Sequence, residues 1–202
     1  MTKIKTGSAP YNGLVDHVKL EMNVPFLVAE QYINTVTRTL LKRLFSLKDK
    51  VYNKVNEERL DKGKPRKARF NNLVSIAGFG NFQLVHAGAK YARYKDQLVI
   101  TLKYIPALTI TDPVLVEEIC HKNTMIKDEA NRLIELIFTY IKETVREYSW
   151  VILNDFGRFQ FRIKQPRLIK SGIAHIGEIK TEPKENIFFQ FEHSVDYTKF
   201  ES

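Results

Sequence analysis

The sequence has one cysteine, one tryptophan and no long apolar run. Cys120 has no partner for an intramolecular disulfide, which favours a reducing compartment or indifference to redox conditions. A membrane-spanning helix needs roughly 18 uninterrupted apolar residues, and no stretch approaches that length. Residues 1–13 are polar and lack the apolar run of a secretion signal. We therefore expect neither a membrane span nor a disulfide-dependent fold.

Signals for catalysis are also scarce. The stretch "GFGNFQ", which begins at Gly78, precedes an expected strand rather than a helix, so it does not fit a dinucleotide-binding loop. Cys120 and His121 are adjacent, which directs their side chains to different faces of a helix. We expect a protein that is not an enzyme and that uses no cofactor or metal. The histidines lack the spacing of metal ligands and are His17, His86, His121, His175 and His193.

The composition is that of a globular protein with an excess of positive charge. A length of 202 residues lies between one domain and two, and 44% apolar residues are enough to form a core. The formal net charge is +9 at pH 7. This charge favours a polyanionic partner such as nucleic acid, or acidic neighbouring proteins.

Helical periodicity occurs twice, each time as a short segment followed by a longer one. Residues 11–22 and 26–47 form the first pair, and residues 111–122 and 123–148 form the second. Asp112 is expected to cap the shorter helix of the second pair, which Pro113 begins. The inner faces of the longer helices are expected to carry Val28, Tyr32, Ile33, Val36, Leu40 and Leu44 in the first, and Ile126, Ala130, Leu133, Ile134, Ile137 and Ile141 in the second.

Each helical pair is followed by two β-branched or aromatic runs that a tight turn separates. In the first copy, "LVSIAGFGNFQLV", Gly78 and Gly80 permit a positive φ or a close approach of backbones. In the second copy, "WVILNDFGRFQFRI", Asp155 replaces the first glycine. We expect the phenylalanines of both turns in the core. The shared signature consists of Gly78, Phe79, Gly80, Phe82, Phe156, Gly157 and Phe159.

These patterns predict an α+β fold with two similar units in one chain. Each unit has the order helix, helix, strand, strand, extended arm, strand. We expect the first unit at residues 1–110, with a basic insert at 56–72, and the second at 111–202, with a long arm at 164–184. Neither half offers a large core by itself, so we expect the helices of both halves to share one.

The element order and the glycine turn resemble the HU/IHF family of bacterial DNA-bending proteins. The resemblance rests on "GFGNFQL" and on "YIPAL" at residues 104–108 in the first half, and on "DFGRF" at 155–159 in the second. Members of that family are usually intertwined dimers of one such unit. The resemblance therefore implies a single-chain, pseudo-dimeric version of the fold and binding to double-stranded DNA.

The arms depart from the family's pattern. Family arms end in "RNPxTG", and the proline of that tip wedges between base pairs and kinks the DNA. The first arm, "HAGAKYARYKDQLV" at residues 86–99, contains no proline. Pro166 and Pro183 of the second arm lie in "KQPRL" and "TEPKE", which do not reproduce the tip. The wedging role is therefore assigned to no residue of this chain.

Basic residues gather in the insert and on or near the arms. They could neutralise phosphates or contact an acidic protein partner. Tyr91 and Tyr94 interleave with the cations of the first arm, where they could stack on a base or pack on a neighbouring subunit. The candidate contacts are Lys62, Lys64, Arg66, Lys67, Arg69, Arg93, Lys95, Arg162, Lys164, Arg167 and Lys170.

Two functions remain open at this stage. The first is an architectural protein that binds and bends double-stranded DNA in the cytoplasm or nucleoid, which the fold and the charge favour. The second is a structural virion protein, because the chain also resembles the IHF-like ring proteins of crAss-like phage tails. The missing tip motif favours the second, as do the mixed charge of the arms and their exposed apolar residues, which include Leu98, Val99 and Ile100.

In the second case the chain would assemble with copies of itself and with other structural proteins into the ring of a tail barrel or connector. Contact with the DNA that passes through such a barrel would be independent of sequence. An exposed β-arm can add a strand to the sheet of a neighbouring subunit. The candidate assembly residues on the arm are Leu168, Ile169, Ile173 and Ile176.

Overall fold

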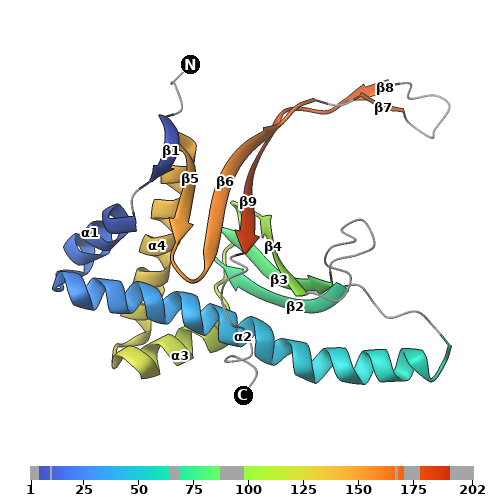
Figure 1. Ribbon diagram of the computed structural model, residues 1–202, viewed down its shortest axis with the longest axis horizontal. Helices are drawn as coiled ribbons and strands as arrows, with labels where there is room; N and C mark the ends of the chain where they lie inside the picture. The colour runs from blue at the N-terminus through green and yellow to red at the C-terminus, as the bar shows by residue number, and fades with distance from the viewer. Residues whose placement is uncertain are drawn as a thin grey trace.

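The fold was analysed in a computed structural model. It describes residues 5–9, 11–63, 69–86, 98–166, 168–170 and 178–191. Four helices and nine strands lie in these ranges, so the protein is α+β, as predicted (Figure 1). The helices are α1 (Tyr11–Met22), α2 (Phe26–Leu60), α3 (Pro113–Asn123) and α4 (Lys127–Glu147).

The helices form two pairs with the same kind of connection. Asn23 joins α1 to α2 with a φ of 52°, and Thr124 joins α3 to α4 with a φ of 52°. The predicted cap of α3 is confirmed, since the Asp112 carboxylate accepts hydrogen bonds from the backbone N–H groups of Val114 at 2.9 Å and Leu115 at 3.2 Å. These bonds satisfy donors that the first helical turn leaves free.

The strands form three sheets. The largest has the order β1-β5-β6-β9, the second has the order β2-β3-β4, and β7 and β8 pair as a small hairpin. All neighbours are antiparallel except β1 and β5, which are parallel. The strands are β1 (Lys5–Ala9), β2 (Arg69–Ile76), β3 (Gly80–His86), β4 (Leu98–Tyr104), β5 (Tyr148–Leu153), β6 (Gly157–Lys164), β7 (Leu168–Lys170), β8 (Glu178–Lys180) and β9 (Lys184–Phe191).

The two glycine turns have matching backbones. Gly78 and Asp155 have φ values of 68° and 57°, and Gly80 and Gly157 have φ values of 153° and 155°. A Cβ at Gly157 would lie 2.6 Å from the Gln190 carbonyl oxygen of β9. The close backbone approach predicted for the first turn is confirmed at Gly80, where a Cβ would overlap the backbone of β4, and the structure shows the same approach at Gly157.

One hydrophobic core joins the two halves. Phe79 of the first turn lies 5.6 Å, centroid to centroid, from the ring of Phe159 and 4.8 Å from that of Phe138 on α4. Phe82 lies 6.0 Å from Phe156 of the second turn. All four of the signature phenylalanines are fully buried. The shared core is thus confirmed, and it gives no boundary between units, so the division at residues 110 and 111 stays a prediction.

The helices lie against the inner face of the sheets, and the inner face predicted for α4 needs one correction. Ala130, Leu133, Ile134, Ile137 and Ile141 are buried. Ile126 is 65% exposed, because it precedes the helix and its backbone N–H donates to the Glu129 carboxylate at 3.0 Å. A residue before the first turn does not follow the helical periodicity of the residues after it.

The insert predicted at residues 56–72 is shorter than expected. Helix α2 continues to Leu60, and strand β2 begins at Arg69. The stretch "NEERL" contains good helix formers and no glycine or proline, so the helix continues through it, and the residues that favour a helix end, Gly63 and Pro65, come later in the sequence.

The prediction of an exposed Ile100 is also wrong, because this residue pairs with Leu84 on the inner face of its sheet and is 1% exposed.

Of the arm predicted at residues 164–184, the structure describes residues 164–166, 168–170 and 178–184. Strands β6 and β9 continue beyond the body of the protein, and further outward β7 and β8 pair as a separate two-stranded sheet (Figure 1). Strand β9 of the second half also lies beside β4 of the first half (Figure 1). The base of the arm therefore stands over the seam between the two larger sheets.

Candidate nucleic-acid interface

The outer face of β6 carries a row of polar and basic side chains. Phe159 of β6 is buried, so the alternate residues point away from the core. Antiparallel pairing places these residues opposite polar or aromatic residues of β9. The facing pairs are Arg158 with Gln190, Gln160 with Phe188, Arg162 with Asn186, and Lys164 with Lys184.

Aromatic rings support both arginines of this face. The Arg158 guanidinium lies 5.4 Å from the ring centroid of Trp150, and the Arg162 guanidinium lies 4.7 Å from that of Phe188. Arg162 also donates two hydrogen bonds to the Gln160 side chain, at 3.0 Å and 2.6 Å. Rings and hydrogen bonds of this kind restrict the arginine rotamers. The positive charge is therefore held in place before any partner binds.

Two lysines continue the row toward the arm. Lys164 and Lys184 are exposed and face each other where the arm leaves the body. Neither forms an ion pair within the described part of the chain. The nearby carboxylate of Glu185 is bound instead to Arg146 of α4, with an N–O distance of 2.9 Å. We call Arg158, Arg162, Lys164 and Lys184 the basic row.

At two described positions, the sheet of β2, β3 and β4 has no cation where β6 has Arg158 and Arg162. Asn81 follows Gly80 in β3 as Arg158 follows Gly157 in β6. By the same alignment, Val85 stands where β6 has Arg162. Among the side chains of this sheet that the structure describes, Lys103 of β4 is the only cation, and it lies on the outer face. The two halves thus share a backbone plan but differ in the residues at these two positions.

The structure brings together only part of the predicted basic set. Arg162 and Lys164 lie in the basic row, Lys62 is exposed in the turn after α2, and Arg69 begins β2. Lys170, Leu168 and Ile169 lie in strand β7 of the arm. The remaining predicted residues lie outside the described part of the chain: Lys64, Arg66, Lys67, Arg93, Lys95, Arg167, Ile173 and Ile176, together with Tyr91 and Tyr94.

The sequence analysis missed Arg158 and Lys184. The signal for Arg158 was present, because "GRFQFRIK" alternates with period two and puts residues 158, 160, 162 and 164 on one face. No such signal existed for Lys184. Its place in the row depends on the register between β6 and β9, which pairs Lys184 with Lys164. That register is set by residues of both strands and not by the sequence near Lys184 alone.

Other kinds of site find no support in the part of the chain that the structure describes. No three His, Cys, Asp or Glu residues of this part lie close enough to hold a metal ion, and Cys120 is a free thiol. None of the described helices combines the length and the apolar character that crossing a membrane requires.

Comparison with known proteins points to nucleic acid. Residues 110–196 match the model of a family described as "Bacterial DNA-binding protein". No curated protein matches the chain. The matched region contains α3, α4 and the strands β5, β6 and β9, and so the whole basic row. This region is thus similar to HU/IHF-like DNA-binding domains, in agreement with the resemblance in the sequence.

Proposed function

We propose that the protein binds double-stranded DNA without sequence preference, through the outer face of β5, β6 and β9 and the base of the arm. The observation that carries the proposal is the basic row, which lies inside the region similar to a DNA-binding family. Four cations along one strand pair can follow a phosphate backbone. Neutralising phosphates releases counterions and supplies affinity that does not depend on sequence.

The chemistry of the face favours phosphate contact over base reading. Arginine presents several donors in a plane and binds phosphate in a bidentate manner. Arg158 and Arg162 lie four residues apart on one face of β6, about 13 Å at the usual strand rise, so each can contact its own phosphate, with Gln160 between them as a neutral donor. The wedge motif of the family is absent from the arms. The proposal therefore includes binding and leaves out strong bending.

A double variant tests this interface. Arg158→Gln with Arg162→Gln removes two charges from the row, and Arg38→Gln with Lys42→Gln removes two from exposed positions on α2. Binding to a fluorescent duplex is measured by anisotropy at several salt concentrations. We expect the first variant to lower the slope of log K against log salt by about 2, since each phosphate contact contributes about 0.9. Equal slopes for both variants would overturn the proposal.

A second candidate is a ring-forming structural protein of a virion, in a phage tail barrel or connector. The observation that favours it is the shape of the arm, which extends far from the body (Figure 1). Among the described strands, β7 and β8 pair only with each other, so each keeps one backbone edge free for a neighbouring sheet. The DNA-binding proposal places the protein in the cytoplasm or nucleoid, and this candidate places it in the virion.

A further inference from the structure

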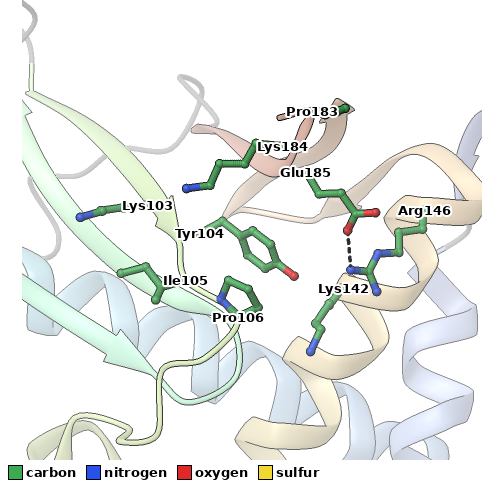
Figure 2. A pocket seen from close by; sticks show the side chains of 9 residues that line it. All are labelled: Lys103, Tyr104, Ile105, Pro106, Lys142, Arg146, Pro183, Lys184 and Glu185. Carbon is green, nitrogen blue, oxygen red and sulfur yellow. Dashed lines mark hydrogen bonds and ion pairs between the residues drawn. The ribbon is translucent and has the colours of Figure 1, made fainter. Parts of the chain in front are cut away.

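A cavity of about 740 Å³ lies beneath the base of the arm (Figure 2). Its walls come from three elements that are far apart in sequence. The end of β4 contributes Lys103 and Tyr104, the last turns of α4 contribute Lys142 and Arg146, and the start of β9 contributes Lys184 and Glu185. A volume of this size is typical of sites for small molecules.

The cavity has an excess of positive charge. Arg146 and Glu185 neutralise each other through their ion pair. Lys103, Lys142 and Lys184 form no ion pair within the described part of the chain. The Lys142 ammonium donates one long hydrogen bond, at 3.4 Å, to the Gly78 carbonyl oxygen and keeps its other protons free. Three lysines without a paired carboxylate therefore line a partly open cavity, with the ammonium groups of Lys103 and Lys184 on one side of Tyr104 and that of Lys142 on the other (Figure 2).

The Tyr104 hydroxyl is a second, independent sign of a ligand. The residue is only 9% exposed, and its hydroxyl oxygen is buried without a hydrogen-bond partner in the described structure. Figure 2 shows this hydroxyl pointing toward α4, from which Lys142 and Arg146 project. Burial raises the pKa of Tyr104, Arg146 lowers it and Glu185 raises it, so the hydroxyl keeps its proton at neutral pH. Buried polar groups normally have a hydrogen-bond partner, so the free Tyr104 hydroxyl indicates that a ligand supplies the acceptor.

We infer that the cavity binds a phosphate monoester, or inorganic phosphate itself. A dianion balances most of the three positive charges, whereas a single carboxylate would leave two of them uncompensated. Its oxygens can accept a hydrogen bond from the Tyr104 hydroxyl and from a lysine side chain that turns toward it. Ile105 and Pro106 form an apolar wall beside these donors, which suits the organic part of a phosphorylated small molecule.

This site is distinct from the proposed DNA interface. Lys184 borders both, but Tyr104 and Lys142 lie on the cavity side and have no place in the basic row. The inference therefore does not rest on DNA binding by the sheet. The same phosphate chemistry could come from a free metabolite or from DNA, and the experiment must separate these two sources.

Calorimetric titration of the full chain tests the inference. The probes are adenosine 5′-monophosphate, inorganic phosphate and adenosine. We expect the first two to bind and adenosine not to bind. Tyr104→Phe removes the free donor and is expected to weaken binding about tenfold, because a hydrogen bond to a charged acceptor is lost. Lys142→Gln is expected to weaken it as much or more, and Lys42→Gln on the exposed side of α2 serves as the matched control.

Folding and DNA binding are checked in parallel. Tyr104→Phe should unfold at the same temperature as the parent or higher, since it deletes a buried donor that has no partner. The Arg158→Gln, Arg162→Gln variant should retain phosphate binding. Three results would overturn the inference: adenosine binding as well as its monophosphate, unchanged affinity in both cavity variants, or phosphate being displaced by a duplex that lacks terminal phosphates.

Discussion

At Gly80 and Gly157 the backbone of one strand comes so close to the next that a side chain has no room. A Cβ at Gly157 would lie 2.6 Å from the Gln190 carbonyl oxygen and 2.7 Å from the Phe189 ring. At Gly78 the backbone is equally unusual, with a φ of 68°, but nothing lies within 4 Å of the added carbon. The pair of glycines in "GFG" therefore serves two different physical needs.

A comparison of alanine substitutions separates these needs. Gly78→Ala should destabilise the fold by about 1–2 kcal/mol, the cost of a left-handed backbone with a Cβ. Gly80→Ala should cost about 1–3 kcal/mol more, because the new carbon overlaps β4 and pushes it away from β3. Urea unfolding of both variants gives the comparison. Equal losses would mean that the close approach at Gly80 does not hold in solution.

The phenylalanines beside these glycines tie the halves together. We expect Phe79→Ala and Phe156→Ala each to lower the free energy of unfolding by about 3–5 kcal/mol, since both rings are fully buried in the shared core. Leu20→Ala, at a position that is 74% exposed, is the control and should change little. A loss below about 1 kcal/mol at both phenylalanines would rule out the buried turn.

At the scale of elements, strand β6 shows how one segment serves the core and the surface together. Its inward residues, such as Phe159, fill the core, and its outward residues, such as Arg158 and Arg162, form the basic row. The strand then leaves the body with β9 as the arm. Their pairing is continuous from Gly157 with Phe191 to Lys164 with Lys184. The body of the protein therefore keeps its full ladder without the outer arm.

Deletion of Gln165 to Glu182 tests what the arm does. We expect the helical core to remain folded, because the β6–β9 pairing ends before the deleted segment begins. If the arm assembles subunits, the deletion should abolish higher-order assembly. Circular dichroism measures the first property and native mass measurement the second.

A second variant replaces the same eighteen residues with a Gly/Ser segment of equal length. It separates the effect of losing the strands from the effect of shortening the chain. It should also fail to assemble, since it lacks the strands that would add to a neighbouring sheet. If the shortened chain still enters the same particle as the parent, the arm serves another purpose.

For the whole molecule, the net charge of +9 is distributed unevenly, because residues 1–110 contain 19 Lys and Arg against 8 Asp and Glu, whereas residues 111–202 contain 13 against 15. Within the less basic half, the basic row lies on β6 and β9, and β3 has Asn81 and Val85 at the positions that correspond to Arg158 and Arg162. A two-fold dimer of identical units would present the same charge on both sides. When both units belong to one chain, the surface residues of one half can differ from those of the other while both halves contribute to the same core.

This distribution leads to a prediction for the intact protein. We expect weak binding to duplex DNA with a steep salt dependence, since the contacts are to phosphates. Little bending is expected, because the arms lack the proline tip that kinks DNA in the family. Fluorescence transfer between the ends of a labelled duplex measures the bend. Tight binding at physiological salt with a large bend would restore the architectural bending function.

The sequence by itself determined the features that depend on neighbouring residues. The α+β class, the two helical pairs, the Asp112 cap and the glycine turns followed from local periodicity and backbone sterics. The shared core followed from the small size of each half. The basic row was predicted in part, at Arg162 and Lys164, because alternation along one strand is also a local property.

Only the tertiary structure decided the features that join distant segments. Strand β1 has a polar sequence without a strand pattern, and it forms because β5 supplies its hydrogen-bonding partner. Lys184 joins the basic row through the register of β9 on β6. The cavity beneath the base of the arm takes its lining residues from β4, α4 and β9. Lys103 and Lys184 are 81 residues apart in the sequence, and they meet at the cavity because β4 folds beside β9.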